Sequence, residues 1–389
     1  MRILAIIPAR GGSKRIPRKN IREFAGRPMI QHSIDAARLA GCFEEIMVST
    51  DDEEIAQIAR HAGAKVPFMR SEATANDFAT TADVINEVLD SYAAQGREFD
   101  AICCLYATAP FVTPRRLLQG AAIIENGEAK GAFTCVRYSY PIQRCLVRDD
   151  EGYVKMMFPE YATTRTQDLQ PTYHDAGQFY FITVESFRKH NTLWAPQTLP
   201  IELPESEVQD IDTPEDWEIA EMKYETGRLP KSFTIGDFTL TSYPLLDDNA
   251  HEFILSERNK PEVRRQMVNR NPIEIDEHLR FVKMLKRRHD CAYYAITNSE
   301  GDIVGSANLH LNDAKRVERG IWIAESYRGK GLAVKIMHNL YDWLKLNLGI
   351  EMVQTMVRHD NAASNALERR LGAHEVNRDE EYVYYELTL

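Results

Sequence analysis

The sequence contains no uninterrupted apolar segment of the roughly 18 residues that would span a bilayer. The apolar stretch at its start is short and is stopped by Pro8, so we expect no signal peptide. The chain also lacks a basic excess, since its formal net charge is −11. Phosphate backbones select basic surfaces, which argues against nucleic acid as the main partner. These absences predict a soluble, cytoplasmic protein with neither membrane nor nucleic acid among its partners.

The six cysteines include no Cys-x-x-Cys pair. Two of them, Cys103 and Cys104, lie inside an apolar run typical of a strand. This distribution favours buried free thiols in a reducing compartment over disulfides or a zinc site.

A cationic, glycine-containing stretch is the most informative feature that is present. Directly after the apolar run 3–7, residues 10–20 hold two adjacent glycines and five Arg or Lys residues. Such a loop lets the backbone approach a polyphosphate while the cations neutralise its charge. The stretch has neither the Walker spacing nor Gly-x-Gly-x-x-Gly. A basic, solvated surface loop is the alternative interpretation.

With 389 residues the chain is too long for one ordinary core, so we expect two domains. Gly227 and Pro230 mark the linker, which gives domains at 1–228 and 232–389. In the first half the pattern predicts strands at 3–7, 45–49, 101–105 and 132–136, and helices at 29–39, 52–61, 80–94, 114–126 and 214–227. This alternation predicts a mostly parallel sheet with helices on both faces and ligands beyond the carboxyl ends of its strands.

After the linker the pattern changes to strands and helices of a different order. It predicts strands at 233–240, 291–297, 303–311, 317–324 and 352–356, polar helices before 286, helices at 331–346 and 362–371, and further strands at the end of the chain.

The segment Pro8-Ala9-Arg10-Gly11-Gly12-Ser13-Lys14, followed by Lys19-Asn20, resembles the signature of the CMP-sialic acid synthetase family of cytidylyltransferases. The resemblance extends over residues 1 to about 225 and implies a Rossmann-like nucleotidyltransferase α/β domain. Its further segments, in order, are Ser49-Thr50-Asp51, Arg70, Asn76-Asp77, Thr108-Ala109-Pro110, Asp175-Ala176-Gly177-Gln178 and Asp210-Ile211-Asp212-Thr213-Pro214.

In this family a sugar hydroxyl attacks the α-phosphorus of CTP and pyrophosphate leaves, so the triphosphate charge must be neutralised. The resemblance implies catalytic roles for Arg10, Lys19 and Asp212. It implies a CTP-binding set of Arg10, Gly11, Gly12, Ser13, Lys19, Asn20, Arg70, Asn76 and Thr108.

Asp210 and Asp212 are two residues apart on an expected extended segment, so their side chains would point the same way. Two carboxylates on one face suit Mg²⁺, which prefers oxygen ligands and bridging phosphates. The alternative is a helix N-cap before Pro214. Within the family pattern we favour Asp212, with Asp210, as metal ligands.

Two departures from the sialate enzymes concern the sugar. Tyr106-Ala107 stands where those enzymes carry Gln-Pro, and that Gln is linked to handling the sugar hydroxyl. The versions Ala-Thr-Ala-Pro-Phe and Asp-Ala-Gly-Gln-Phe-Tyr are instead similar to the pseudaminic acid branch of the family. The resemblance therefore places Tyr106, Asp175 and Gln178 near the sugar. For Tyr106, a packed aromatic at a strand end is the alternative.

In the second half, Tyr327-Arg328-Gly329-Lys330-Gly331 follows an expected strand and opens a long helix. This segment resembles the coenzyme A loop of the GNAT acetyltransferases, which implies a second α/β domain that uses acetyl-CoA. Backbone N–H groups there would bind the pyrophosphate of coenzyme A. The acetyl-CoA set implied by the resemblance is Ile323, Arg328, Gly329, Lys330, Gly331, Leu332, Ala333, Asn361 and Ser364. The alternative for the loop alone is an ordinary tight turn.

The segment from Arg258 to Met267, with Glu277-His278, is similar to the GNAT branch that acetylates the 4-amino group of a UDP-linked 4-amino-4,6-dideoxy sugar. Arg258 and His278 would then bind the nucleotide sugar, or else they are charges on a helix surface. Glu318 matches the position of a base that deprotonates the amine in many relatives. Glu368 stands where relatives often have a Tyr that protonates the leaving thiolate, so the acid is unassigned, with Tyr382 and Tyr384 as candidates.

The sequence thus predicts a bifunctional enzyme of pseudaminic acid synthesis. One domain would form CMP-pseudaminic acid with Mg²⁺, and the other would acetylate an amino-sugar intermediate. Two alternatives stay open: activation of legionaminic or sialic acid with acetylation of that product, and a non-catalytic acetyl-CoA-binding second domain. We also expect a homo-oligomer, namely a dimer.

Overall fold

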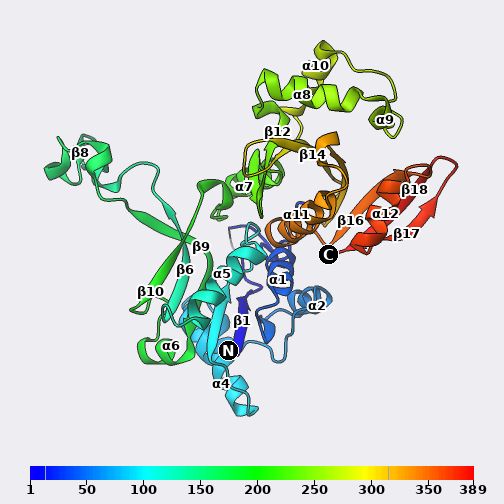
Figure 1. Ribbon diagram of the computed structural model, residues 1–389. Coiled ribbons are helices and arrows are strands. Elements are labelled where there is room, and N and C mark those ends of the chain that lie inside the picture. The colour runs from blue at the N-terminus through cyan, green and yellow to red at the C-terminus, as the bar shows by residue number, and fades with distance from the viewer. Residues whose placement is uncertain (14, 314) are drawn as a thin grey trace. The chain divides into compact units, whose positions relative to one another are not determined.

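A computed structural model describes residues 1–13, 15–313 and 315–389, and divides the chain into two compact units, Met1–Lys223 and Tyr224–Leu389. Lys14, one of the five cations in the glycine-containing stretch, lies outside the described residues. Each unit has its own sheet with helices, which confirms the α/β class for both halves (Figure 1). Within the described residues, no helix is long and apolar enough to cross a membrane.

The first unit is built on a six-stranded sheet in the order β10-β6-β9-β5-β1-β4. These strands are β1 (Ile3–Pro8), β4 (Glu45–Ser49), β5 (Ala101–Leu105), β6 (Gly131–Arg137), β9 (Tyr173–Thr183) and β10 (Thr198–Leu203). β1 pairs in parallel with β4 and β5, whereas β9 runs antiparallel to β5 and β6. The carboxyl ends of β1, β4 and β5 therefore meet at one edge, where the sequence placed the ligand.

Helices cover both faces of this sheet. The helices are α1 (Met29–Ala40), α2 (Glu53–His61), α3 (Glu72–Ala75), α4 (Thr81–Ala94), α5 (Pro114–Glu125), α6 (Val184–His190) and α7 (Pro214–Gly227). One apolar cluster joins the sheet to Ile34 of α1 and Leu117 of α5, and a second joins the other face to Val88 of α4 and Phe187 of α6. Continuous apolar strands buried on both faces explain why the first-half strands were readable from sequence.

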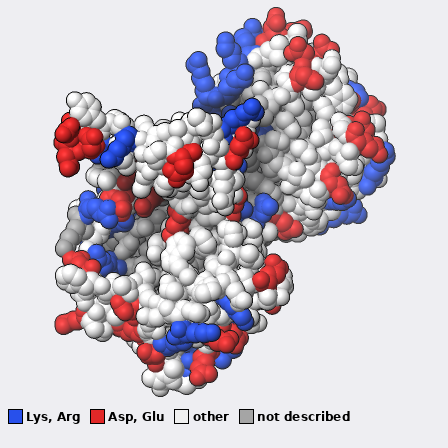
Figure 2. Space-filling model, turned by 90° about the vertical axis from the view of Figure 1, so that its left-hand side faces the viewer, with Lys and Arg blue, Asp and Glu red and all other residues white. Residues whose placement is uncertain are grey.

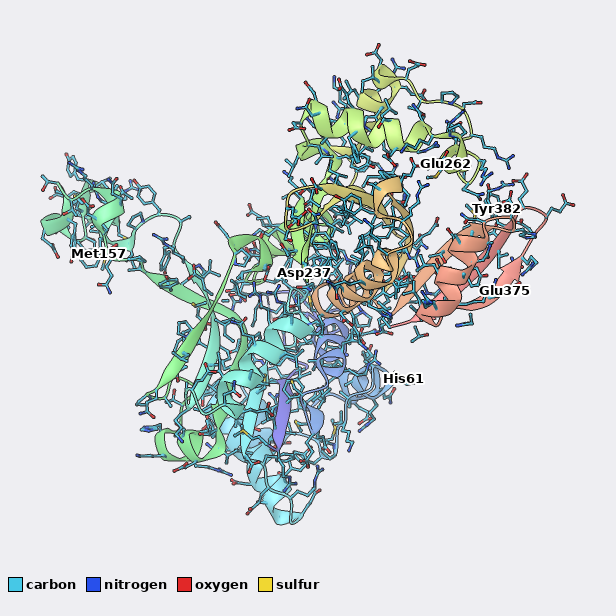
Figure 3. All side chains as sticks on the ribbon, in the orientation of Figure 1. His61, Met157, Asp237, Glu262, Glu375 and Tyr382 are labelled. Atoms are coloured by element: carbon cyan, nitrogen blue, oxygen red, sulfur yellow. The ribbon has the colours of Figure 1, made fainter. Side chains whose placement is uncertain are left out.

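An arm leaves this unit between β6 and β9. It contains the hairpin of β7 (Leu146–Arg148) and β8 (Val154–Met156), and Met157 lies toward its outer end (Figure 3). Another short hairpin, β2 (Glu23–Phe24) with β3 (Arg27–Pro28), follows the cationic loop. On the face seen in Figure 2, acidic and basic side chains are interspersed over most of the surface, with one group of Lys and Arg at its upper edge.

The second unit has an eight-stranded sheet in the order β11-β12-β13-β14-β15-β16-β18-β17. Its strands are β11 (Ser232–Ile235), β12 (Phe238–Ser242), β13 (Cys291–Thr297), β14 (Ile303–Leu311), β15 (Arg316–Ile323), β16 (Met352–Arg358), β17 (His374–Arg378) and β18 (Tyr382–Thr388). All neighbours are antiparallel except β15 and β16, which pair in parallel over only three residues each, from Arg316↔Met352 to Glu318↔Gln354. Beyond Glu318 and Gln354 the two strands separate and form a fork.

The helices of this unit are α8 (Asp248–Asn259), α9 (Pro261–Arg264), α10 (Ile275–Leu285), α11 (Leu332–Leu348) and α12 (Ala362–Leu371). α11 and α12 pack on one face through Met337 and Leu371. α8 and α10 pack on the other through Ile254 and Val282. The sheet is therefore covered on both sides around the fork.

One predicted element was wrong. The range 233–240 was expected to be one strand, but it is the hairpin of β11 and β12, with Ile235 paired to Phe238. Gly236 at the turn adopts φ +55°, a left-handed conformation that glycine allows. A Gly-Asp turn between two apolar runs is a hairpin signal, and alternation alone concealed it.

Candidate active sites

The first unit contains a cavity of about 540 Å³ at the carboxyl ends of β1 and β5. Its lining combines the cationic loop, the segment around α3 and the residues that follow β5. The lining residues are Pro8, Arg10, Ser13, Arg15, Ile16, Lys19, Asn20, Arg70, Thr74, Asn76, Asp77, Ala79, Thr80, Thr81, Val84, Tyr106, Ala107, Thr108 and Asp212. Most of the residues predicted to bind CTP therefore meet in one place, whereas Gly11 and Gly12 are not among the lining residues.

The backbone of the loop is held closely against the start of α2. The Gly11 amide donates a 2.9 Å hydrogen bond to Oδ1 of Asp51. A Cβ on Gly11 would lie 2.7 Å from Oδ2 of Asp52, whereas one on Gly12 would meet nothing within 4 Å. Asn20 Nδ2 donates to the Arg10 carbonyl over 2.9 Å and ties the two ends of the loop together. Gly11 is thus required by close packing.

Cations outnumber carboxylates in the lining. Arg10 Nη1 lies 2.7 Å from Oδ1 of Asp77, and Arg15 Nη1 lies 2.7 Å from Oδ2 of Asp212. Lys19 Nζ donates to the Ile211 carbonyl over 2.5 Å and lies 3.5 Å from Oδ1 of Asp212. With Arg70, the described lining has four cations against two carboxylates. The cavity therefore suits an anionic ligand of several charges.

Arg70 is built into the end of β4 rather than extended into solvent. It is 9% exposed, and it donates to Ser49 through Nε to Oγ at 3.0 Å and through Nη2 to the carbonyl at 2.6 Å. Burial lowers the pKa of its guanidinium. The cost of burying this cation is offset by fixed hydrogen bonds, which hold it at the cavity wall.

The two candidate metal ligands are separated by the structure. Asp212 lines the cavity, and Asp210 is not among its lining residues. The helix cap expected as the alternative role belongs to neither: Thr213 Oγ1 accepts from the Asp216 amide at 3.2 Å, and Asp216 Oδ2 accepts from the Thr213 amide at 2.7 Å. Among the described residues, no group of three or more His, Cys, Asp or Glu is arranged so that it could hold a metal ion. One cavity carboxylate still fits Mg²⁺, because this ion is commonly held by one or two carboxylates together with substrate phosphates.

The three predicted sugar residues take different positions. Tyr106 lines the cavity, its ring lies 5.5 Å from that of Tyr180, and burial raises the pKa of its hydroxyl. The Tyr180 hydroxyl in turn donates to Oδ2 of Asp175. Gln178 is 3% exposed and its Nε2 donates to the Glu207 carbonyl over 2.7 Å. Asp175 is thus linked to the cavity through Tyr180 and Tyr106. Gln178 is buried outside the cavity and holds the Glu207 backbone through its hydrogen bond.

Sequence reasoning missed Arg15 and left Asp77 without a role. Arg15 lay within the recognised cationic stretch, so its charge was a visible signal. Its partner Asp212 is 197 residues away in the sequence, and only the fold joins them.

The second unit contains a cavity of about 840 Å³ in the fork between β15 and β16. The walls are the separated parts of the two strands, the loop before α11, helix α12, and α9 with the residues after it. The lining residues are Glu262, Val263, Arg265, Gln266, Met267, Asn308, Arg319, Gly320, Ile321, Trp322, Ile323, Tyr327, Arg328, Gly329, Gly331, Leu332, Ala333, Val334, Thr355, Met356, Val357, Arg358, Asn361, Ala363, Ser364, Ala366, Leu367, Glu368 and Arg370.

The loop at the start of α11 is shaped by two glycines. Gly329 and Gly331 both adopt φ +75°, and α11 begins at Leu332. Arg328 Nε donates to the Ile323 carbonyl over 2.9 Å and ties the loop to the end of β15. The amides at the start of this long helix are therefore presented to the cavity, an arrangement that suits a phosphate.

Eight of the nine residues predicted to bind acetyl-CoA line this cavity, and Lys330 does not. The Lys330 ammonium instead lies 5.1 Å from the ring centroid of Tyr327. Asn361 Oδ1 accepts from the Ser364 amide at 3.0 Å and caps α12. The second predicted segment thus has a structural role in addition to its place in the wall.

The proposed base and acids of the second unit do not all reach the cavity. Glu318 is exposed on β15, opposite His310 of β14, and is not among the lining residues. Tyr382 and Tyr384 are also outside it, and the Tyr384 hydroxyl donates to Asp379 Oδ2 over 2.7 Å. Glu368 does line the cavity, although it is 2% exposed.

Arg258 and His278 both lie outside this lining. His278 Nε2 lies 3.0 Å from His251 Nδ1, and burial, followed by the charge of His251, lowers the pKa of His278 to about 4. Arg258 Nη2 donates to the Asn269 carbonyl over 2.6 Å, and burial lowers the pKa of its guanidinium. His278 is therefore a buried group, whereas Arg258 is half-buried.

Comparison with known proteins matches each unit to a family. Residues 4–197 match the family model described as cytidylyltransferase, and residues 238–374 match the one described as acetyltransferase (GNAT) domain. The pseudaminic acid cytidylyltransferase of Campylobacter jejuni is 40% identical over 224 residues, which are 58% of this chain and 97% of that protein. The CMP-N,N'-diacetyllegionaminic acid synthase of Legionella pneumophila is 38% identical over 231 residues, 57% of this chain and 95% of that protein. Among solved structures, the Campylobacter jejuni N-acetyltransferase PseH covers 39% of this chain and 98% of its own, at 19% identity and a TM-score of 0.33, too low a similarity to bear on function.

Proposed function

The chain belongs to the cytidylyltransferase family, and we propose that it is a bifunctional enzyme of pseudaminic acid biosynthesis. The first activity, assigned to residues 1–228, forms CMP-pseudaminic acid from CTP. The second, assigned to residues 232–389, acetylates the amino group of a UDP-linked 4-amino-4,6-dideoxy sugar with acetyl-CoA. The observation that carries the proposal is the cationic cavity of the first unit, in a chain that also contains a GNAT domain.

The cavity lining supports nucleotidyl transfer. The sugar hydroxyl forms a new bond to the α-phosphorus of CTP and loses its proton to solvent. The bond from this phosphorus to the bridging oxygen breaks, and its electron pair leaves on pyrophosphate. Arg10, Arg15 and Lys19 lie in the cavity wall, and only two carboxylates balance their charge. A bound triphosphate would replace these carboxylates, Asp77 and Asp212, as the anionic partner of the three cations. Neutralising the pyrophosphate leaving group is the main electrostatic demand of this reaction.

Asp212 is the residue we propose to hold Mg²⁺. It lies in the cavity between Arg15 and Lys19, and a triphosphate that takes up these cations would release its carboxylate. When bound, Mg²⁺ would supply further neutralisation of the phosphates. Asp210 stays in the proposal as a second ligand only on the strength of the family resemblance.

The remaining lining groups suit the nucleoside and the sugar. We assign Asn20, Arg70, Asn76 and Thr108 to the cytidine end, since they supply fixed donors and acceptors in the same cavity. Tyr106 is our candidate at the sugar. Asp175 would orient Tyr106 through Tyr180, and Gln178 would position the backbone beside Tyr106, whose amide donates to the Gln178 carbonyl over 2.9 Å.

The fork of the second unit supports acetyl-CoA binding. Its pyrophosphate would be bound by the amides from Arg328 to Ala333, and its extended arm would lie between the separated strands β15 and β16. Glu318 remains our candidate base and would act through water, because it is exposed outside the cavity wall. Arg258 and His278 remain candidates for positioning the nucleotide sugar.

Two observations each support an alternative function for one of the units. The 38% identity to a legionaminic acid enzyme supports a different sugar in the first reaction. Glu368, in place of a proton-donating tyrosine, supports a second domain that binds acetyl-CoA without catalysis. Turnover of pseudaminic, legionaminic and N-acetylneuraminic acid with CTP, and of UDP-4-amino sugars with acetyl-CoA, separates all of these.

We also propose a homodimer that forms through the arm. Three apolar side chains there, Tyr140, Leu146 and Tyr153, are 74%, 64% and 70% exposed. An isolated two-stranded hairpin is marginally stable at best in water. A second copy of the chain that covers these side chains would stabilise the arm and remove its exposed apolar surface.

A further inference from the structure

A buried ion pair forms part of the wall of the second cavity. Arg319 Nη2 lies 2.9 Å from Oε2 of Glu368, and the side chains are 3% and 2% exposed. The Tyr341 hydroxyl accepts two more hydrogen bonds, from Arg319 Nε at 2.8 Å and Nη2 at 2.5 Å. Burial raises the pKa of Tyr341, so it stays a neutral hydroxyl. Arg319 is thus held rigidly from two helices, α11 and α12.

The position of this pair in the fork is specific. Pairing between β15 and β16 ends at Glu318↔Gln354, so Arg319 and Thr355 are the first residues beyond it. Val317 and Val353 are paired and face α11 and α12. Arg319 and Thr355 lie two residues further along their strands, and side chains two residues apart on a strand point to the same face. Arg319 and Thr355 therefore stand side by side at the apex of the cavity, on the same side of the sheet.

Arg319 and Thr355 each have a donor with no partner among the described residues. Thr355 is 5% exposed and lines the cavity, yet its Oγ1 has no hydrogen-bond partner in the part of the chain that the structure describes. For Arg319, Nε and Nη2 are committed to Tyr341 and Glu368, which leaves Nη1 as its donor for a ligand. An unpartnered buried hydroxyl costs stability, so its retention at a cavity apex points to a ligand atom.

Glu368 is not a substitute for a tyrosine acid in this geometry. As the anionic partner of an ion pair it accepts hydrogen bonds and has no proton to give. A buried ion pair is commonly no more stabilising than apolar residues of similar volume. Stability alone therefore does not explain the ion pair in the wall. We interpret its function as fixing the Arg319 cation at the apex of the cavity.

We propose that Arg319, with the hydroxyl of Thr355, stabilises the departing thiolate of coenzyme A, in place of a general acid. Glu368 and Tyr341 are positioning residues that act through Arg319. This inference rests on the proposed acetyl transfer. The amine nitrogen forms a bond to the thioester carbonyl carbon, the C–S bond breaks, and its electron pair leaves on sulfur. The amine proton goes to the base or to solvent, and the thiolate takes its proton from solvent after release.

The test uses free coenzyme A and the full-length protein, without any sugar. An opposite charge within about 4–6 Å lowers the pKa of an acid by about one unit or more, and for free cysteine the thiol pKa is about 8.5. Coenzyme A should therefore bind about fivefold tighter at the pKa of its free thiol than below neutrality, and about tenfold tighter well above that pKa, because binding favours the thiolate. Desulfo-coenzyme A, which has no thiol, should show no such rise. Titration calorimetry across this pH range measures both.

Variants separate this role from a structural one. Arg319→Met/Glu368→Met removes both charges together, which avoids leaving one buried and unpaired. This double variant should lose the pH-dependent rise in coenzyme A affinity and still bind desulfo-coenzyme A. The single variant Arg319→Lys keeps a cation and should therefore retain part of the rise. Thr355→Val should reduce the rise. A coenzyme A affinity that is flat with pH in the unmodified protein, or a rise that persists in the double variant, would overturn the proposal. Failure to acetylate any amino sugar would count against the proposed function and leave this binding result unaffected.

Discussion

Asp212 Oδ2 lies 2.7 Å from Nη1 of Arg15, and this contact joins the segment before α7 to the cationic loop after β1. Because Thr213 and Asp216 cap the helix between themselves, the Asp212 carboxylate is available to the cavity. Asp212 is one of only two carboxylates beside four cations in the lining, and it is therefore the place where we expect a divalent ion to enter with a polyphosphate.

Asp212→Ala should reduce CMP-sugar formation by about 100-fold or more, the usual loss when one electrostatic group at a transferring centre is removed. The measurement is pyrophosphate release at saturating CTP and Mg²⁺. Acetyl transfer should be unchanged, since Asp212 belongs to the first unit. Glu215→Ala, an exposed change three residues away, is the matched control. Loss of both activities in a folded Asp212→Ala protein would contradict two independent sites.

Gly11→Ala should damage the first site far more than Gly12→Ala. The new Cβ at position 11 would meet Asp52 Oδ2 at 2.7 Å, whereas at position 12 it meets nothing within 4 Å. Asp52 caps α2 and pairs with Arg18, so it cannot move without further loss. We expect a destabilisation of about 1–3 kcal/mol and a raised KM for CTP, seen by denaturant unfolding and steady-state kinetics. Equal effects of the two substitutions would show that close packing is not why Gly11 is there.

The second unit should lose stability as the pH falls from about 6.5 towards 4. His278 has a pKa of about 4 in the folded protein, lowered first by burial, and about 6.5 when unfolded. The unfolded chain therefore takes up the proton first, and the unfolding free energy falls by up to about 2 kcal/mol between pH 7 and pH 5. His278→Gln lacks this titration, so urea unfolding should show a smaller loss. The same pH slope in both proteins would argue against the buried neutral pair of His278 and His251.

Thr355→Val should stabilise the second unit by about 1 kcal/mol, because it removes a buried hydroxyl that has no protein partner. It should also slow acetyl transfer, if the hydroxyl serves the thiolate. Thermal unfolding and initial rates measured on one preparation show both effects. A variant that is less stable and equally active would mean that the hydroxyl has neither role.

Substitution of the arm should change the oligomeric state. Tyr140→Asp/Tyr153→Asp places charge on the two most exposed aromatic rings of the arm and should give monomers by sedimentation velocity. Tyr140→Phe/Tyr153→Phe keeps the apolar surface and should leave the dimer intact. If the unmodified protein is monomeric at micromolar concentration, the proposed homodimer is wrong.

Local signals in the sequence predicted much of the fold. Strands buried on both faces, such as Ala101–Leu105, and helices with clear starts, such as Ala362–Leu371 after Asn361, agree with expectation because neighbouring residues determine them. The antiparallel β9 was not expected, since nothing in its own residues shows which strand it will pair with.

Long-range pairs explain why the sites were only partly readable. Glu368 was recognised as a departure, but its partner Arg319 is 49 residues away, so its charge state was not visible. Gln178 was placed at the sugar from its motif, whereas the register of β9 turns its amide toward Glu207. Motifs identified which segments form each cavity, and pairing across the sheet decided which side chains enter it.

A competition among sugars tests most directly which nonulosonic acid the protein activates. The protein, CTP and Mg²⁺ are mixed with equal amounts of pseudaminic, legionaminic and N-acetylneuraminic acid, and the CMP-sugars are separated and quantified. We expect CMP-pseudaminic acid to predominate and its formation to fall with Asp212→Ala. Preferential formation of either of the other two CMP-sugars would contradict it.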